Sequence, residues 1–342
     1  MATVQMNPYD PRNLHLSDEE YLRSGHLACP GCGAALGLRI ALKTLGEKTM
    51  VVIPACCFAV CVGSYPFSAA KVPVINVAFA TAAISAAGIR AGLEAQGKTD
   101  VTVLAWAGDG GTFDIGLQSL SATVERNDNI IYVCYDNEAY MNTGIQRSSA
   151  TPYGAWTTTT PLPSPKQEPK KDIVGILAEH RIPYAATASI AFPEDFARKL
   201  AKAKSIPGTK FLHLWVSCPT GHKSEERFSI RIARLAVETG IFPLYEVEYG
   251  DRYTINWEPS FRDVKEYLGL QGRFRHLSEA QIATIRGNVR SEWKRLRAKV
   301  RLGNELEQED RSTEDMLGCS LAGARPLSQA ESVLGLGTDA WR

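Results

Sequence analysis

The sequence predicts an α/β fold in which a parallel sheet carries helices on both faces. Short apolar runs alternate with helical patterns along the chain, which is typical of strand–helix–strand units. The expected strands are apolar at nearly every position, as in strands that are buried on both sides. This alternation extends to about residue 250 and then stops.

The strands and helices follow one another at regular spacing. The expected strands are residues 49–54, 73–79, 101–106, 129–135, 184–188 and 210–216. The expected helices are residues 81–96, 114–126, 173–180 and 193–204. The helix 81–96 is rich in Ala and Gly, so a neighbour can pack closely against it, and Gly97 marks its end. Residues 156–171 hold four prolines and no hydrophobic period, which predicts a loop.

Three regions are expected along the chain. Residues 1–24 form a polar arm interrupted by prolines, residues 25–250 form the main domain, and residues 251–342 form a mostly helical C-terminal extension. Within the extension, residues 278–302 have the pattern of a charged amphipathic helix. The mixed composition after about residue 303 predicts no particular element.

Composition gives no support to a role in binding nucleic acid or a membrane surface. The chain of 342 residues has a formal net charge of +1 and no block of five or more like charges. We expect no signal peptide, no transmembrane helix and a cytoplasmic location, because no apolar segment of the required kind is present. In that compartment the eight cysteines are metal ligands, catalytic groups or core residues rather than disulfides.

A glycine-rich turn follows the expected strand 101–106. It reads Gly108-Asp109-Gly110-Gly111 and precedes a helix. Backbone N–H groups at such a turn point outward, and glycines let the chain approach a diphosphate closely. A carboxylate among them suits Mg²⁺, which prefers oxygen ligands. The turn alone could equally be an ordinary one, so it needs a second observation.

The second observation is a polar strand end, at residues 136–144 (DNEAYMNTG). The carboxyl ends of parallel strands lie on one edge of a sheet, where ligands bind. We therefore expect the side-chain oxygens of Asp109 and Asn137 to share one cation. Two ordinary turns are the alternative, and this second strand end makes that alternative less favourable.

The cysteines form a second group of candidate ligands. Cys29-Pro30-Gly31-Cys32 is a C-x-x-C motif in a loop before a helix, and it could belong to a thioredoxin-like motif, a zinc site or a cluster site. A four-thiolate site needs two more ligands. The remaining cysteines are Cys56, Cys57, Cys61, Cys134, Cys218 and Cys319. Cys134 lies in an apolar strand and is expected in the core, whereas Cys56, Cys57 and Cys218 follow strands. Spacing alone does not separate zinc from iron–sulfur.

Several segments resemble one enzyme family. The arrangement of Asp109 and Asn137 resembles the thiamine-diphosphate motif, and residues 108–144 resemble the 2-oxoacid:ferredoxin oxidoreductases in particular, as do Gln146 and residues 148–152. The segments 217–222 (SCPTGH), 234–256 and 267–277 look like the β subunit of the pyruvate type of this family. The resemblance extends from about Gly25 to about residue 300, and it implies a thiamine-diphosphate-binding fold.

The resemblance implies roles for residues on both motifs. Asp109, the Asn137 side chain and the Ala139 carbonyl would bind Mg²⁺. Gly108, Gly110 and Gly111 would contact thiamine diphosphate, together with Thr143, Cys57 and Phe58. Asn142 would be the catalytic residue near the thiazolium and the substrate. Phe58, Phe79 and Phe113 are expected as apolar walls or simply as core.

The resemblance also implies a [4Fe–4S] cluster bound by Cys29, Cys32, Cys57 and Cys218. Cys57 is preferred over Cys56 because the family places its third ligand 25 residues after the second, although Cys56 replaces a usual glycine. Cys61 is a weaker alternative that we interpret as packing. His26 and His222 are expected to face solvent or form hydrogen bonds rather than to bind metal, since four cysteines complete the site.

The implied activity is oxidative decarboxylation of a 2-oxoacid, with pyruvate and coenzyme A as the expected substrates. Electrons would pass from a thiamine enamine, one at a time, to the cluster and then to ferredoxin. An α subunit would supply the activating glutamate, and γ and ferredoxin-like δ subunits would complete the enzyme. The alternatives are another 2-oxoacid (oxalate, a branched-chain 2-oxoacid or an aryl glyoxylate), another electron acceptor, a decarboxylase without a cluster, or a zinc-stabilised subunit without redox activity.

Overall fold

The structure is a computed structural model that describes residues 16–317. One compact unit ends at Val300, and a second begins at Arg301. The unit that ends at Val300 contains the whole sheet and both cysteine and glycine-rich motifs, so the account of the fold and the site concerns this unit.

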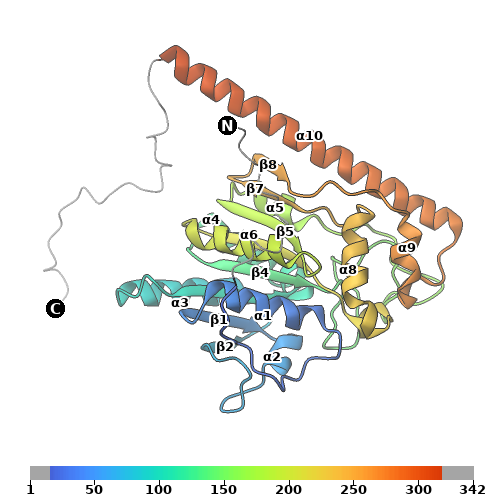
Figure 1. Cartoon of the computed structure of the whole chain (residues 1–342), viewed down its shortest axis with the longest axis horizontal. Helices are drawn as coiled ribbons and strands as arrows, with labels where there is room; N and C mark the ends of the chain where they lie inside the picture. The colour runs from blue at the N-terminus through green and yellow to red at the C-terminus, as the bar shows by residue number, and fades with distance from the viewer. Residues whose placement is uncertain (1–15, 318–342) are drawn as a thin grey trace, which may run out of the picture. The chain divides into compact units, whose positions relative to one another are not determined.

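An eight-stranded sheet with the order β2-β1-β3-β4-β6-β5-β7-β8 forms the centre of this unit (Figure 1). The strands are β1 (Thr49–Pro54), β2 (Val74–Val77), β3 (Thr102–Gly108), β4 (Ile131–Asp136), β5 (Tyr184–Ser189), β6 (Lys210–Trp215), β7 (Tyr245–Glu248) and β8 (Arg252–Ile255). From β2 to β5 all neighbouring strands are parallel, which confirms the predicted α/β class. Their carboxyl ends share one edge of the sheet.

The last two strands form an antiparallel hairpin that the sequence did not reveal. β7 pairs with β5 and with β8, in both cases antiparallel. The turn between β7 and β8 contains residue 250, where the main domain is expected to end. The expected domain limits remain predictions, and the hairpin adds residues beyond that limit to the same sheet.

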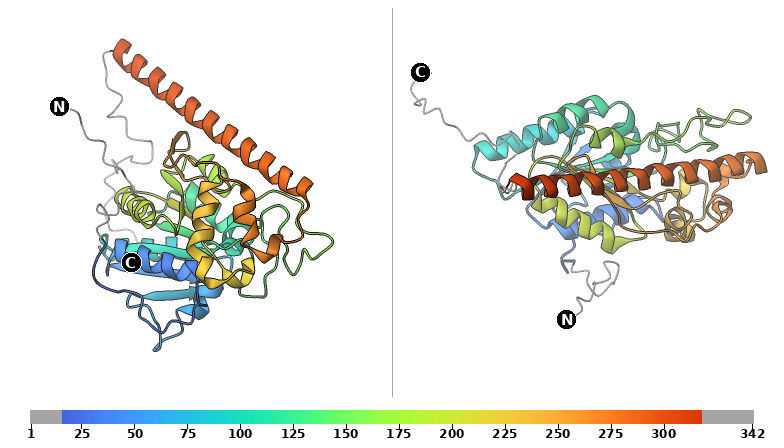
Figure 2. Two further views of the ribbon diagram at one scale, coloured as in Figure 1. Left: turned by 45° about the vertical axis from the view of Figure 1, so that its right-hand side comes forward. Right: turned by 90° about the horizontal axis from the view of Figure 1, so that it is seen from above.

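Helices cover both faces of the sheet, as predicted (Figure 2). One face packs against α1 (Gly33–Leu45), α6 (Pro193–Ser205) and α8 (Ser229–Glu238). The other face packs against α3 (Ala82–Ala95), α4 (Leu117–Glu125), α5 (Ile173–Ala178) and the part of α10 (Glu279–Leu317) that precedes residue 301. The short elements are α2 (Cys57–Cys61), α7 (Pro219–His222), α9 (Val264–Gly269), η3 (Glu226–Phe228) and η4 (Gly272–Phe274).

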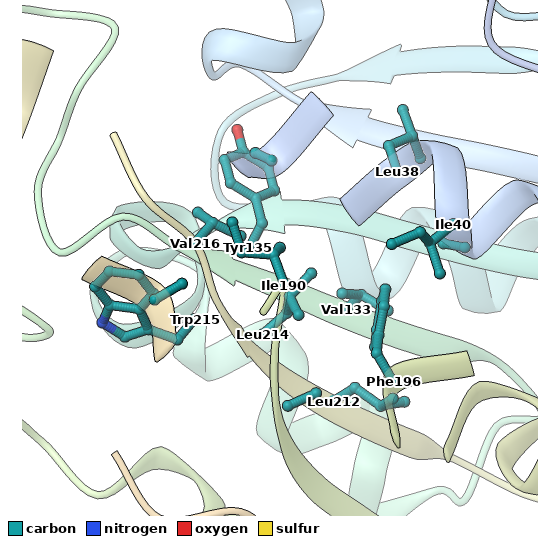
Figure 3. Close-up of a cluster of buried hydrophobic side chains, with 14 of the residues drawn as sticks. Leu38, Ile40, Val133, Tyr135, Ile190, Phe196, Leu212, Leu214, Trp215 and Val216 are labelled. Carbon is teal, nitrogen blue, oxygen red and sulfur yellow. The ribbon is translucent and has the colours of Figure 1, made fainter. Parts of the chain in front are cut away.

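Alternating side chains of each strand feed two separate cores. In β3, Leu104 and Trp106 join the core beneath α1, whereas Val103 and Ala105 join the core beneath α3. Figure 3 shows the first core, where Leu212 of β6 lies among its apolar neighbours. Burial on both faces explains why these strands are apolar at nearly every position.

Two of the predicted elements differ in detail. The strand expected at 73–79 is the four-residue β2, and it is not buried: Ile75 is 37% exposed because β2 lies at the edge of the sheet. The helix expected at 114–126 begins as a π-helical turn, η2 (Gly110–Asp114), which is followed by α4. π-Helical turns are rare and occur frequently at functional sites.

Candidate functional site

The glycine-rich turn connects β3 to η2 at the carboxyl edge of the sheet. Its backbone lies so close to neighbouring rings that side chains at Gly110 and Gly111 would crowd them. A Cβ atom on Gly110 would lie 2.4 Å from Cε1 of Tyr140, and one on Gly111 would lie 3.1 Å from the ring of Phe79. The Tyr140 hydroxyl donates to Asp114 Oδ2 at 2.8 Å, which fixes the ring over the turn.

Asp109, Asn137 and Ala139 meet at one point of this edge. The Asn137 amide lies 2.9 Å from the carbonyl oxygen of Ala139 and 3.1 Å from Asp109 Oδ1. Its nitrogen can donate to both atoms, but if its oxygen faces them instead, three oxygens converge and need a cation between them. Adjacent ligands of an octahedral Mg²⁺, with bonds of about 2.1 Å, lie about 3.0 Å apart. Both separations therefore match those between adjacent ligands of a magnesium ion.

Asp109 is buried at this edge of the sheet. This carboxylate is 1% exposed and accepts a hydrogen bond from Ser148 Oγ. Burial raises the pKa of Asp109 well above its usual range, and the nearby charge of Asp136 adds to this effect. A divalent cation would relieve both effects, because it favours the ionised carboxylate.

Asn142 and Thr143 are exposed in the turn that follows. Tyr140 N–H donates to the Gln146 carbonyl at 2.9 Å, which closes the turn. The Thr143 hydroxyl donates to Gln146 Oε1 at 2.6 Å, so it is already engaged within the turn. The contacts of Asn142 and Thr143 with a cofactor remain predictions.

Two buried carboxylates, Asp136 and Glu138, flank Asn137 and were missed as site residues by the sequence reasoning. The cations that pair with them are Lys170, from the loop expected at 156–171, and Arg273, from η4. Both cations come from segments distant in sequence, so the spacing of residues along the chain does not predict their pairing with these carboxylates. Glu138 is engaged in this ion-pair network.

The cysteine motifs converge from three segments. The Leu27 N–H donates to the Cys61 carbonyl at 3.0 Å, and the Gly33 N–H donates to the Ser217 carbonyl at 3.0 Å. These bonds attach the loop that contains Cys29 and Cys32 to α2 on one side and to the start of α7 on the other. α1 begins at Gly33, directly after the C-x-x-C motif, as the sequence predicts.

The thiols lie close enough to affect one another's ionisation. Burial raises the pKa of Cys57, and repulsion from the thiols of Cys218, Cys61, Cys56 and Cys32 raises it further. Burial likewise raises the pKa of Cys218 to about 12. Such thiols stay protonated at neutral pH unless a bound metal ionises them.

Within residues 16–317, no three His, Cys, Asp or Glu side chains are gathered tightly enough to hold a single ion. Each thiolate of a [4Fe–4S] cluster binds its own iron at a separate corner, so a cluster site does not need such a gathering. The candidate magnesium ligands are one carboxylate, one amide and one backbone carbonyl. They therefore do not form a group of three His, Cys, Asp or Glu side chains either.

The neighbouring cysteines Cys56 and Cys57 have different surroundings. The Tyr135 side chain and the backbone of Gly108 lie close enough to Cys56 to affect the pKa of its thiol. Cys57 instead interacts with Cys218 and Cys32. Cys56 thus lies beside the glycine-rich turn, and the choice of Cys57 as the third thiolate remains a prediction.

The structure also places other cysteines and one further histidine in the core or near the thiols. Cys134 is fully buried in the core. His213 is buried and forms a 2.7 Å contact with Asp136. Cys61 is buried and lies near the other thiols, so it remains the weaker alternative ligand. Cys319 lies outside the described residues.

His222 links the two ligand sets. Its Nδ1 accepts from the Cys218 N–H at 3.4 Å, and its Nε2 lies 3.1 Å from the Asn137 carbonyl oxygen. Both ring nitrogens are thereby engaged, so His222 is a hydrogen-bonding residue rather than a metal ligand, as expected.

Comparison with known proteins gives the class first. Residues 67–214 match the family of thiamine pyrophosphate enzymes, C-terminal TPP-binding domain. A solved 2-oxoglutarate:ferredoxin oxidoreductase from Magnetococcus marinus has the same fold, with a TM-score of 0.52 at 20% identity over 82% of this chain and 96% of that one. The chain is thus built on the thiamine-diphosphate-binding fold that the resemblance implied.

Closer relatives give the family. The chain is 50% identical to the ketoisovalerate oxidoreductase subunit VorB of Pyrococcus horikoshii, over 84% of this chain and 95% of that one. It is also 50% identical to the pyruvate synthase subunit PorB of Methanothermobacter thermautotrophicus, over 83% of this chain and all of that one. The chain belongs to the β subunits of the 2-oxoacid:ferredoxin oxidoreductases.

None of the described helices has the length and apolar character that a membrane crossing demands.

Proposed function

We propose that this chain is the catalytic subunit of a cytoplasmic enzyme that oxidatively decarboxylates pyruvate with coenzyme A and passes the electrons to ferredoxin. One observation carries the proposal: the oxygen set of Asp109, Asn137 and Ala139 and the sulfur set around Cys57 and Cys218 lie at one edge of the sheet. His222 connects their backbones there.

The oxygen set would hold Mg²⁺, and the backbone of the glycine-rich turn would hold the diphosphate of thiamine diphosphate. When bound, the thiazolium supplies an acceptor for the electrons that decarboxylation leaves behind. The residues of this chain position it: Gly108, Gly110 and Gly111 allow close approach, and Asn142 lies in the exposed turn beside the metal ligands. Phe58 and Phe113 are buried and keep water from the inner wall.

The thiolates of Cys29, Cys32, Cys57 and Cys218 would bind a [4Fe–4S] cluster. Cys29 is exposed, whereas Cys57 and Cys218 are half-buried, so the set extends from the cofactor side of the edge to the surface. This placement suits electron transfer from a buried cofactor to an external carrier, in contrast to a purely structural zinc site.

A partner chain would complete the site. Ylide formation on thiamine needs a glutamate, but the carboxylates described at this edge already have partners: Asp114 accepts from Tyr140 and Ser149, and Glu138 pairs with Lys170 and Arg273. We propose that an α subunit supplies the glutamate and that γ and ferredoxin-like δ subunits complete the enzyme.

The surface beside the site supports such a partner. The segment that follows α2 presents Tyr65 and Phe67 with exposed fractions of 94% and 88%. Exposed aromatic side chains of this kind are typical of interfaces. The chain alone is therefore expected to be inactive.

The substrate is the finer part of the proposal. One set of relatives is named pyruvate synthase and another ketoisovalerate oxidoreductase, so a branched-chain 2-oxoacid is the second candidate. The test is to purify the chain with its partner subunits and assay pyruvate, 2-oxoisovalerate, 2-oxoglutarate and oxalate with coenzyme A and a viologen acceptor. Pyruvate should give the highest kcat/KM, and a higher value for 2-oxoisovalerate would favour the second candidate.

The cluster has its own test. Iron, acid-labile sulfide and zinc are measured on the same anaerobic preparation. We expect about four iron and four sulfide per chain bound to these cysteines, beyond those of any cluster-bearing partner subunit. Stoichiometric zinc without iron would contradict the redox role.

A further inference from the structure

Asn137 lies between two buried carboxylates. Asp136, the last residue of β4, is fully buried, and Glu138 is 2% exposed. Buried carboxylates are costly unless they are paired and hydrogen-bonded. What pairs with them therefore determines whether the turn that presents Asn137 and Ala139 can form.

One ammonium group contacts both carboxylates. Lys170 Nζ lies 2.9 Å from Glu138 Oε1 and pairs still more closely with Asp136 Oδ2. Its side chain is 21% exposed, and the ring of Phe242 lies 5.7 Å away. Lys170 belongs to the proline-rich segment 156–171, so this segment reaches into the site although its sequence predicts only a loop.

The two carboxylates differ in their other partners. Glu138 also pairs with Arg273 and accepts a bond from Trp215 Nε1 at 3.2 Å. Asp136 has only the imidazole of His213 beside Lys170 among its described side-chain partners, and burial lowers the pKa of that histidine, which keeps it neutral. Of the described cations, Lys170 is thus the one that pairs with Asp136 and the one that joins both carboxylates.

The backbone of this turn is held in an unfavourable conformation. Glu138 has φ of +68°, in the left-handed region that non-glycine residues rarely adopt. Its N–H donates to Asp136 Oδ1 at 2.8 Å, and its carbonyl accepts from Thr151 Oγ1 at 2.6 Å. Such a conformation persists where surrounding contacts determine it from several sides.

We propose that Lys170 is a positioning residue for the metal-binding turn. By drawing Asp136 and Glu138 to one ammonium, it fixes the strained turn so that the Asn137 side chain and the Ala139 carbonyl meet Asp109. The segment 156–171 is then part of the cofactor site. This inference rests on the proposed function, because it assigns Mg²⁺ and thiamine diphosphate to these ligands.

Charge and position predict opposite effects for loss of this lysine. A cation near the ligands repels Mg²⁺, so removing only its charge would tighten Mg²⁺ binding. Removing an element that positions two of the three ligands would weaken Mg²⁺ binding instead. The direction of the change therefore separates the two roles.

The experiment uses the assembled enzyme, purified with its partner subunits and freed of Mg²⁺ and thiamine diphosphate. Mg²⁺ is titrated at fixed thiamine diphosphate, and binding is followed by near-ultraviolet circular dichroism. Lys170→Met should raise the Mg²⁺ concentration for half-saturation at least tenfold, and Lys170→Arg should restore most of the affinity. Arg147→Gln is the control, because it removes an exposed cation that pairs with Glu168 of the same segment; its half-saturation should stay within about twofold of wild type.

Each outcome decides between the claims. Wild-type enzyme that shows no Mg²⁺-dependent binding of thiamine diphosphate would refute the proposed function itself. If wild-type enzyme shows Mg²⁺-dependent binding and the Lys170→Met variant needs the same Mg²⁺ concentration or less, this inference alone would be overturned. If Lys170→Met does not fold, the variant Asp136→Asn with Lys170→Met removes the uncompensated charge; it should fold and still need at least tenfold more Mg²⁺, and wild-type affinity in it would also overturn the inference.

Discussion

A substitution of Gly110 by alanine tests whether the glycine-rich turn is shaped by close packing. The added Cβ would lie 2.4 Å from Cε1 and 2.5 Å from Cδ1 of Tyr140. Ordinary contacts begin near 3.4 Å, so the ring or the turn must move by about 1 Å. The Tyr140 hydroxyl is held by its hydrogen bond to Asp114, and the Phe79 ring contacts the Tyr140 ring edge-on with centroids 5.9 Å apart. The Tyr140 ring therefore has little freedom to move.

Overpacking of this kind costs about 1–3 kcal/mol, which corresponds to about 5- to 150-fold in an equilibrium constant. We expect Gly110→Ala to weaken Mg²⁺–thiamine diphosphate binding to the assembled enzyme within this range, measured by titration with circular dichroism. The matched control is Gly92→Ala in α3, where no atom lies within 4 Å of the new methyl group. That change should leave binding unaltered and slightly stabilise the helix.

A double variant separates crowding from other effects. Tyr140→Ala removes the ring that the new methyl group meets, so Gly110→Ala should cost less in the Tyr140→Ala background than in wild type. Equal costs in both backgrounds, or wild-type binding by Gly110→Ala itself, would show that the ring does not define the turn.

Three further outcomes are expected. Cys57→Ser should remove most of the iron of one cluster from the chain, whereas Cys56→Ser should keep the wild-type iron content. Iron and sulfide analysis of anaerobic protein measures both. Lys199→Met should lower the free energy of unfolding by about 2 kcal/mol in a denaturant titration, because the fully buried Asp195 loses its 2.7 Å partner and keeps only its 2.9 Å ion pair with Arg198; a loss below about 0.5 kcal/mol would contradict this reasoning. Burial lowers the pKa of Lys210 to about 7 in the folded chain. Between about pH 7 and 10 the unfolded chain therefore binds more protons than the folded chain, and the free energy of unfolding rises with pH over this range. Lys210→Met should abolish that gain, worth about 2 kcal/mol between pH 7 and 9, and an unchanged pH slope in urea melts would show that the lysine is not buried as a neutral base.

The sequence was most informative where structure depends on residues that are close together along the chain. Apolar runs located the parallel strands within a few residues, because burial on both faces demands them. The edge strand β2 was predicted as buried because Val74–Val77 has the same apolar character, and only the strand order shows that it lies at the edge of the sheet. The hairpin of β7 and β8 was missed because its short strands mix charged and apolar residues.

The site was predicted through its motifs but not through its supports. Asp109 and Asn137 follow strand ends, which are local features that a sequence displays. Lys170 and Arg273 act across the fold, and their partners are fixed only when a loop and η4 reach the carboxylates of the turn. Likewise, the sequence left Cys56 and Cys57 equally able to reach the other thiols, and the choice of Cys57 remains a prediction.

The nearness of the two ligand sets follows from one strand pairing. β4 and β6 are parallel neighbours, and Asp136 pairs in register with Trp215 at their carboxyl ends. The chain continues from these residues to Asn137 and to Cys218, which therefore emerge side by side although the two strands are distant in sequence. A shift of one residue in this register would turn the side chains of β6 to the opposite face and separate His222 from the Asn137 carbonyl. A short connection between the proposed magnesium ligands and the proposed cluster thiolates is thus a property of the sheet, and it requires no flexible loop to bring them together.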